Sequence, residues 1–340
     1  MRDIANNFTR LREVNAELVR STLKSVAAAT KTELASATGL SVATCANILS
    51  TMLASGEAMV KETGVPAGGR PPKLFAYDAS FSLTALIFPK AIAGKKILLY
   101  AIVDAKGDTV EKKAIDVKQL GMAQLTGLLG DIRSRYKNLK VVAVAAPGLV
   151  RDGNIGISDI DELENMAIRE PLEAMFSLPV VVENDTNCAA VGFHYLHRER
   201  GSTVVYMVVP SKNATGAGIV IDGKLHRGHT SFAGELSFMP LGVTRERQFA
   251  GLTEKQTIDY VSRLVTMVIP VVNPSVLVIG HETLDAKALS RLRETCAKSI
   301  PEEHMPALEL RDSLDEDCLA GLAVLAANRL SGRVRLVEED

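Results

Sequence analysis

Tryptophan is absent from this chain, and aromatic residues make up only 4% of its 340 residues, so aliphatic side chains must build its cores. Cysteine is scarce as well: Cys45, Cys188, Cys296 and Cys318 lie far apart and include no CxxC pair. This spacing predicts neither a disulfide framework nor a zinc site built from cysteines. Hydrophobic residues at 47% and charged residues at 23% are close to globular averages, which excludes a disordered chain or a fibrous repeat.

Long apolar runs are also missing. Residues 1–7 are polar and lack the apolar region of a signal peptide, and the most apolar stretch, 264–280, is interrupted by Pro270, Asn273 and Pro274. We therefore expect a cytoplasmic protein with no membrane partner. The length exceeds the roughly 100–200 residues of one domain, which predicts two or three folding units.

The net charge is only −1, but charge is unevenly distributed along the chain. The first 75 residues, called the head below, carry nine Lys and Arg against six Asp and Glu, whereas the remaining residues carry 30 against 34. An excess of positive charge in one part of a chain favours a nucleic-acid partner for that part.

The head has the pattern of three helices followed by two strands. Apolar residues from Leu11 to Val26 recur three and four apart, which predicts the first helix. The second helix opens at Thr30 or Lys31 and ends at Gly39, and the third is capped by Ser41 and ends at Gly56. Segments 58–62 and 73–77 read as strands, with the glycine- and proline-rich segment 67–72 as a wing between them.

Two helices joined by a short turn form a helix-turn-helix, whose second helix presents its N-terminal face to the major groove of DNA. The residues predicted to contact operator DNA are Ser41, Val42, Thr44 and Asn47 of the third helix and Arg70 and Lys73 of the wing. Such heads act in pairs on two-fold symmetric sites, which predicts a homodimer or homotetramer. Three-helix units also serve as docking modules without DNA contact, and this alternative stays open.

The rest of the chain alternates short apolar strands with helical stretches, which predicts an α/β body. The expected strands span 83–89, 96–104, 140–146, 180–183, 203–210 and 218–221, and the expected helices span 125–136, 172–176 and 253–268.

Three strand-to-turn junctions of the body carry polar or glycine-rich motifs: 145–148, 183–187 and 233–236. Asp185, directly after a buried strand, is placed to hold a hydroxyl group or to act on it as a general base. The alternative is structural: Asn184 and Asp185 cap a helix that starts at Asn187, and Glu235 is a carboxylate at a helix N-terminus.

In their order along the chain, these motifs resemble the ROK family, the repressors and sugar kinases within the actin-like ATPase superfamily. The matching segments are 33–35, 38–41 and 68–71 in the head, and 146–150, 152–153, 183–190, 216–225, 227–228, 233–235, 273–274, 278–280 and 320–323 in the body. The resemblance implies a winged helix-turn-helix domain over 1–75, followed by a two-lobed actin-like (ribonuclease H-like) ATPase fold. Its first lobe would span 76–195 together with a C-terminal helix at 311–340, and its second lobe 196–310. The resemblance also implies sugar binding by Gly148, Asn184, Asp185 and Glu235.

The chain departs from the family where its kinases hold ATP. The first strand, 81–92, lacks the Asp and the glycine pair of the first phosphate loop, residues 212–216 read Lys-Asn-Ala-Thr-Gly in place of the second, and Gly280 alone remains of the third glycine run. Glycines let backbone N–H groups approach phosphate oxygens. We therefore expect no ATP, no cofactor and no catalytic residue, with Asp185 left as a vestigial base.

The zinc ligands of the family are missing too. Phe238 stands in the place of a His that also contacts sugar in the family, and 241–258 contains neither Cys nor His, so we expect no bound metal. The pair His194 and His197 has no further ligand at suitable spacing and is expected at the surface. The acidic run 312–317 is expected to be a solvated helix start.

The sequence thus predicts a sugar-responsive transcriptional regulator, a repressor, whose body is catalytically inactive. Its partners would be operator DNA and a sugar or sugar phosphate effector. Two alternatives stay open: an active ATP-dependent sugar kinase that carries a DNA-binding head, and a constitutive DNA-binding scaffold with a vestigial cleft.

Overall fold

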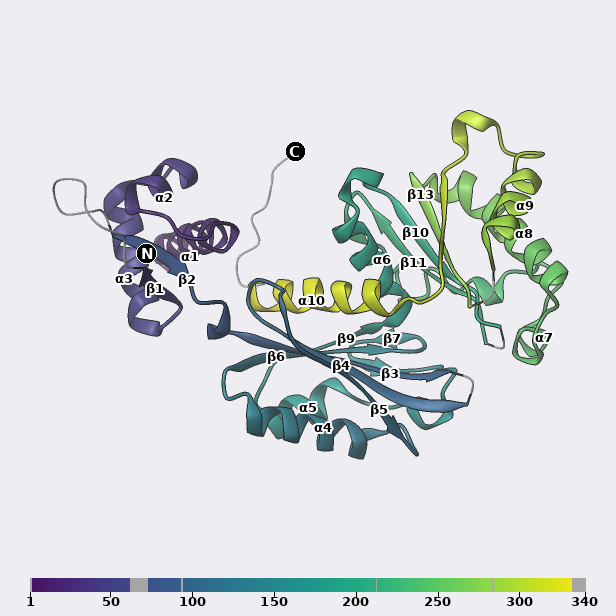
Figure 1. The fold of residues 1–340 in the computed structure, drawn as a ribbon, viewed down its shortest axis with the longest axis horizontal. Coiled ribbons are helices and arrows are strands. Elements are labelled where there is room, and N and C mark those ends of the chain that lie inside the picture. The colour runs from purple at the N-terminus through teal and green to yellow at the C-terminus, as the bar shows by residue number, and fades with distance from the viewer. Residues whose placement is uncertain (1, 62–72, 93, 212, 283, 332–340) are drawn as a thin grey trace.

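A computed structural model describes residues 2–61, 73–92, 94–211, 213–282 and 284–331 (Figure 1). The head contains the predicted helices α1 (Arg2–Ser25), α2 (Lys31–Thr38) and α3 (Val42–Ser55), followed by the antiparallel strands β1 (Ala58–Lys61) and β2 (Leu74–Tyr77). The predicted contact residue Arg70, and the whole segment 67–72, lie outside the described residues.

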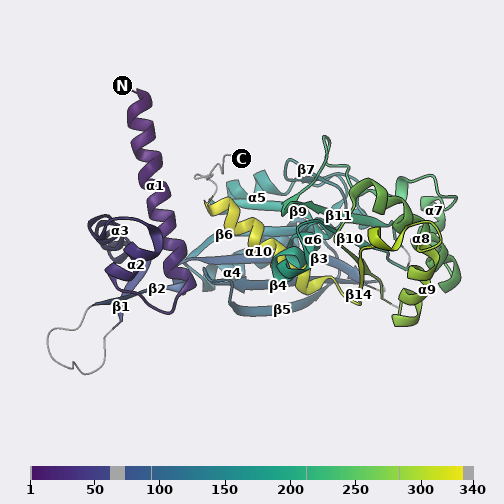
Figure 2. The same cartoon turned by 90° about the horizontal axis from the view of Figure 1, so that it is seen from above.

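Local capping explains why the head helices begin where they do. Thr30 and Glu33 form a capping box at the start of α2, and the Ser41 hydroxyl accepts a hydrogen bond from the Thr44 N–H at the start of α3. The helices and the two strands then close over a small apolar core that includes Leu23, Leu34, Leu49 and Phe75. In Figure 2, the N-terminal part of α1 extends away from this core, and Leu11 is exposed.

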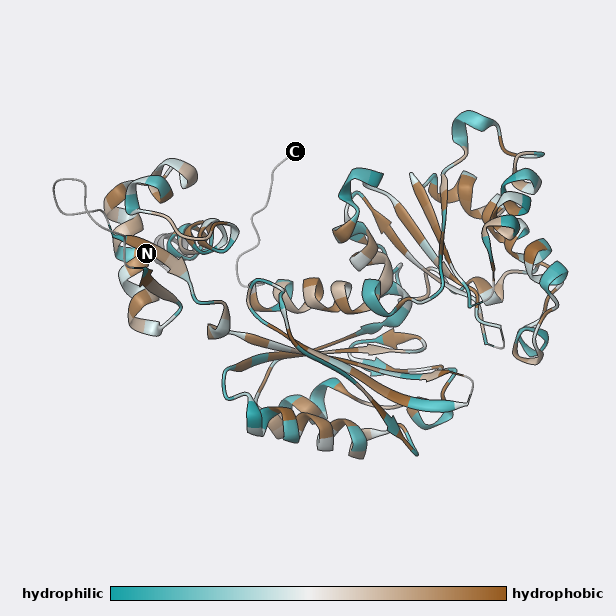
Figure 3. Ribbon diagram, in the orientation of Figure 1, coloured by the Kyte–Doolittle hydropathy of each residue, from teal (hydrophilic) through white to brown (hydrophobic). Residues whose placement is uncertain are grey.

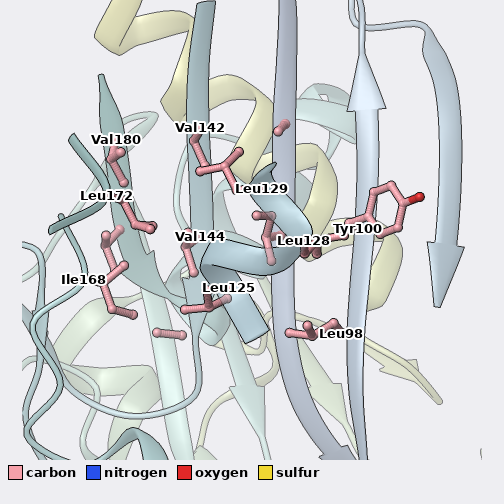
Figure 4. Close-up of a cluster of buried hydrophobic side chains, with 14 of the residues drawn as sticks. Leu98, Tyr100, Leu125, Leu128, Leu129, Val142, Val144, Ile168, Leu172 and Val180 are labelled. Carbon is pink, nitrogen blue, oxygen red and sulfur yellow. The ribbon is translucent and has the colours of Figure 1, made fainter. Parts of the chain in front are cut away.

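The body contains two five-stranded sheets, which confirms the predicted α/β class. The first has the order β5-β4-β3-β6-β9, built from Thr109–Val117, Lys95–Val103, Leu83–Ile92, Leu139–Ala146 and Val180–Asn184. Strands β3, β6 and β9 are parallel, and β4 and β5 are antiparallel to their neighbours. One face packs on α4 (Met122–Arg135) and α5 (Arg169–Phe176), whose leucines meet the valines of β6 and β9 (Figure 4).

The second sheet has the order β12-β11-β10-β13-β14, built from Lys224–Leu225, Gly216–Ile221, Val204–Val208, Val276–Gly280 and Ala307–Arg311. The helices α8 (Glu254–Val272) and α9 (Ala286–Cys296) cover its outer face. Shorter elements are the strands β7 (Val150–Arg151) and β8 (Asn154–Ile155), helix α7 (Arg245–Ala250), and 3₁₀ turns at Ala79–Phe81, Asp161–Leu163, Arg198–Arg200, Leu236–Phe238 and Glu302–His304. Figure 3 shows that apolar residues concentrate on the strands and on the inward helix faces.

Two helices, α6 (Asp185–Leu196) and α10 (Asp315–Ser331), fill the space between the two sheets (Figure 1). They cross with their backbones in contact at Gly192 and Gly321. A Cβ added at Gly321 would lie 1.8 Å from the Cys188 carbonyl oxygen, and one at Gly192 would lie 1.8 Å from the Asp317 carbonyl oxygen. The glycines are therefore required by this crossing, which holds the two helices together as one unit.

No single helix in the described part of the chain is both long and apolar enough to cross a membrane. Helices α2 and α3 are long and apolar enough only when they are taken together. The angle between them at the break is 114°.

Candidate functional site

A cleft of about 220 Å³ opens between the two sheets. It brings together Gly148, Asn184, Asp185 and Glu235, the four residues predicted to bind a sugar. These residues come from the ends of β6 and β9 and from the turn before Leu236–Phe238, so strand ends of the first sheet face a loop of the second. The volume is below the roughly 300–1,000 Å³ of sites for drug-sized molecules, which favours a small ligand.

Gly148 and Asn184 shape the floor of the cleft. Gly148 has φ +115, and a Cβ there would lie 2.3 Å from the Ile157 carbonyl oxygen, so only glycine fits. Its carbonyl accepts a hydrogen bond of 2.8 Å from Asn184 Nδ2, while Asn184 Oδ1 accepts one of 2.9 Å from the Asn187 N–H. Asn184 is thus the N-cap of α6. The predicted start of this helix at Asn187 is wrong: Asp185 is already in the first turn, because Asn184 supplies the cap.

Asp185 lines the cleft as the first residue of α6. Its Oδ1 accepts a 2.8 Å hydrogen bond from the Thr186 N–H. Burial raises the pKa of Asp185 from 3.8 to about 7, the negative charge of Asp159 adds to this rise, and the Thr186 hydrogen bond opposes it. At neutral pH the carboxyl group is therefore only partly ionised.

Two further charged residues, which were not among the predicted site residues, line the cleft and affect the pKa values of its carboxyl groups. Asp159 and Arg245 both line it, and Asp159 accepts a hydrogen bond from the backbone of Ala214. Burial raises the pKa values of Asp159 and Glu235, and the positive charge of Arg245 opposes both rises. Asp159 and Glu235 thus share the field of the Arg245 guanidinium group. Arg245 lies within 241–258, a segment in which no sequence motif marks a binding residue.

An ion pair joins the two sides of the cleft next to Asp185. Arg227, which follows β12 of the second sheet, contacts the buried carboxylate of Glu183 through Nε at 2.8 Å and Nη2 at 2.6 Å. The other oxygen of Glu183 accepts hydrogen bonds from the Asn184 N–H and from Asn187 Nδ2. The charge of Glu183 is thereby satisfied, and the segment 183–187 is fixed against the second sheet.

Further residues that line the cleft already have partners within the protein. Strand β3 pairs regularly with β4 as far as Ile92, opposite Lys95. The Thr215 N–H donates a 3.0 Å hydrogen bond to Gln248 Oε1. Lys90 forms an ion pair with Asp315 in the first turn of α10.

Two predictions about charged residues need correction. The acidic run does start helix α10, but Asp317 is buried and accepts a 3.1 Å hydrogen bond from the Tyr206 hydroxyl, because α10 enters the core at this turn. His194 and His197 are half-buried rather than at the surface, and the ring of His197 lies 4.6 Å from that of Phe193. Among the described residues, no group of three or more His, Cys, Asp and Glu could hold a metal ion.

In the head, the candidate DNA contacts of α3 lie on one open face. Val42 is 46% exposed, Ser41 and Asn47 are exposed, and Thr44 is half-buried with its hydroxyl 2.9 Å from that of Ser41. Lys73 is exposed immediately before β2. Cys45 and Leu49, on the opposite side of α3, are buried in the core of the head.

Comparison with known proteins agrees with this arrangement: residues 92–253 match the ROK family. The chain carries a ROK family domain. The structure of a ROK family transcriptional regulator, a homologue of the E. coli MLC protein, aligns with 95% of this chain and 98% of its own at a TM-score of 0.68 and 18% identity. The ROK hexokinase of Thermus thermophilus aligns with 74% of this chain and 99% of its own at a TM-score of 0.58 and 18% identity. These matches confirm the predicted two-lobed actin-like fold behind a helical head.

The sequence relatives of this chain include both repressors and kinases. The xylose repressor of Caldicellulosiruptor bescii is 25% identical over 243 residues, which are 68% of this chain and 59% of that protein. The xylose repressor of Bacillus subtilis is 22% identical over 253 residues, or 70% and 63%. A beta-glucoside kinase of Listeria monocytogenes is 28% identical over 149 residues, or 43% and 50%. The chain thus spans about 60% of the length of the xylose repressors that it matches.

Proposed function

We propose that this protein is a sugar-responsive, DNA-binding transcriptional regulator, a repressor, with a catalytically inactive ROK body. The observation that carries the proposal is the head: α2 and α3 form a helix-turn-helix, and the N-terminal face of α3 is open to solvent. Support comes from the relatives named xylose repressor, and from the regulator structure that aligns with 95% of the chain where the hexokinase aligns with 74%.

The DNA-binding proposal is tested by selecting binding sequences from random duplexes with the full chain. We expect two half-sites arranged with two-fold symmetry, about one helical turn or a multiple of it apart, roughly 34 Å per turn, because a homodimer or homotetramer presents two heads. Asn47→Ala should relax discrimination at one position of each half-site by about 1–3 kcal/mol. Lys73→Ala should weaken binding to all sequences and reduce the salt slope by about one.

Lys112→Ala is the matched control for the lost charge, because Lys112 is an exposed lysine of β5 in the body. Its affinity for the selected duplex should equal that of the unmodified chain. If the selection enriches no sequence, and Lys73→Ala behaves like Lys112→Ala, the head is a docking module instead.

The effector half of the proposal rests on the cleft, whose carboxyl groups and amide suit the hydroxyl groups of a sugar. A sugar that binds the folded chain raises its unfolding free energy by about 2.7 kcal/mol at 100 times the dissociation constant. A thermal-shift screen of pentoses, hexoses and their phosphates should therefore yield at least one stabilising compound that changes operator affinity. Stabilisation without any change in operator affinity would leave the head as a constitutive DNA-binding module.

We further propose that the body does not phosphorylate sugars. Strand β3 pairs with β4 as far as Ile92 and contains no glycine, and the Thr215 N–H is bonded to Gln248, whereas phosphoryl transfer depends on groups that position and neutralise phosphates. We expect no ADP release above background with pentoses, hexoses or N-acetylhexosamines, and no heat on titration with an ATP analogue.

The competing function, an active sugar kinase, is favoured by one observation: the pKa of Asp185 near 7 suits a general base. Turnover that falls about 10²- to 10⁴-fold in Asp185→Asn would establish the kinase and reject the inactive body. The same variant should leave operator affinity unchanged if the body only senses sugar.

A further inference from the structure

One wall of the cleft is aromatic, which is unusual in a chain with only nine Phe and no Trp. Phe232 and Phe238 both line the cleft, and their ring centroids lie 5.0 Å apart at an interplanar angle of 55°. They remain 44% and 47% exposed, so a large part of each ring is left uncovered by the described residues. Exposed aromatic rings grouped inside a cleft mark a surface for an apolar part of a ligand.

The same turn also supplies a carboxyl group. The Glu235 N–H donates to the Phe232 carbonyl oxygen at 3.4 Å, and the Phe238 N–H donates to the Glu235 carbonyl oxygen at 3.2 Å. Residues 232, 235 and 238 are thereby held in one compact turn. A ligand that reaches Glu235 with a hydroxyl group therefore lies beside both rings.

Arg245 fixes this wall in place. Its guanidinium group lies 4.5 Å from the centroid of Phe238 and 5.9 Å from that of Phe249, and its Nη1 donates a 2.6 Å hydrogen bond to Ser237 Oγ. Stacking between the two rings restricts the guanidinium group, and the guanidinium group in turn restricts Phe238. The aromatic wall is thus a preformed surface rather than a pair of freely rotating side chains.

We propose that the ligand of this cleft is a glycoside with an apolar substituent, an alkyl or aryl group, that packs on Phe232 and Phe238. The sugar hydroxyl groups lie toward Asp159, Asp185 and Glu235, and the substituent extends along the exposed rings toward solvent. This inference rests on the proposed function, which assigns a sugar ligand to the cleft. It specifies in addition which class of sugar binds there. Burial of the substituent and of the exposed ring faces supplies binding free energy that a free sugar lacks.

Calorimetric titration with matched probes tests the inference. The probes are free glucose and xylose, their methyl glycosides and their phenyl glycosides in both anomeric forms. We expect at least one phenyl glycoside to bind ten times or more tightly than the corresponding free sugar. Phe232→Ala and Phe238→Ala should remove most of this difference, because the substituent packs on these two rings.

Phe249→Ala is the matched control, because Phe249 is 41% exposed and stacks on the same Arg245 but does not line the cleft. It should leave the preference for the phenyl glycoside intact, and thermal unfolding of all three variants verifies that they are folded. A free sugar that binds as tightly as its phenyl glycoside overturns the inference and leaves the sugar-responsive regulator standing. Glycoside binding without any operator binding supports the inference and rejects the regulator. Binding of none of the probes overturns the inference whether or not operator DNA is bound.

Discussion

Gly321→Ala should destabilise the protein by about 3 kcal/mol, which would lower the midpoint of thermal unfolding by about 4 °C. The added methyl group would lie 1.8 Å from the Cys188 carbonyl oxygen, a backbone atom of α6 that no rotamer change can move. The two helices must therefore separate, and the core between the sheets loses contacts along the whole crossing.

Gly127→Ala provides the control for this substitution. Gly127 is an exposed residue within α4, and a Cβ there has no neighbour within 4 Å. Alanine is better than glycine in a helix interior by about 1 kcal/mol, so this variant should unfold at the same temperature or higher. Differential scanning calorimetry of both variants and of the unmodified chain measures these midpoints. Equal midpoints for Gly321→Ala and the unmodified chain would show that the α6 and α10 backbones do not touch.

Asp185→Asn should stabilise the protein by up to about 4 kcal/mol at pH 8 and by almost nothing at pH 4. Burial raises the pKa of Asp185 to about 7 in the folded chain, against 3.8 for an ordinary aspartate. Well below pH 3.8 the carboxyl group is protonated in both the folded and the unfolded chain, and it has no effect. As the pH rises from 4 to 7, the unfolded chain loses this proton first, so the ionisable side chain costs progressively more folding free energy, and the full cost is present above about pH 7.

The measurement is the unfolding free energy of both proteins by denaturant titration between pH 4 and pH 8. Asp285→Asn is a control with the opposite sign, because Asp285 accepts a 2.8 Å hydrogen bond from the Ala288 N–H, which lowers its pKa. That variant should be less stable than the unmodified chain at pH 7, and its deficit should disappear in acid. A stability difference for Asp185→Asn that stays constant between pH 5 and pH 8 would contradict the raised pKa.

The sequence predicts best those features that depend on neighbouring residues. The capping residues Thr30 and Ser41 and the terminal residues Gly39 and Gly56 place the head helices correctly, because capping acts over three or four residues. Strand β5 is not predicted, because this exposed edge strand is rich in charged residues and has little apolar alternation. Asp159 and Arg245 are likewise missed as cleft residues, since no local pattern marks a side chain whose role is set by the field of distant residues.

The acidic run 312–317 likewise depends on distant residues. Charge alone indicates a solvated surface, yet Asp317 is buried against the Tyr206 hydroxyl, 111 positions away in the sequence. The candidate sugar site can be predicted from the sequence only in part. Its motifs at 145–148, 183–187 and 233–236 are visible in the sequence, but their convergence in one cleft depends on the packing of two sheets.

The close crossing of α6 and α10 has a consequence for communication between the cleft and the head. Helix α6 begins at Asp185 in the cleft, and α10 begins at Asp315 on the opposite side of the same cleft. The 17 residues of α10 extend about 25 Å, and in Figures 1 and 2 the last turn lies on the side of the body nearest the head. Because the two backbones interlock at Gly192 and Gly321, they cannot slide past each other, and a displacement of α6 moves α10 with it. If the proposed sugar displaces α6 at the cleft, the same displacement would be carried across the body by this helix pair.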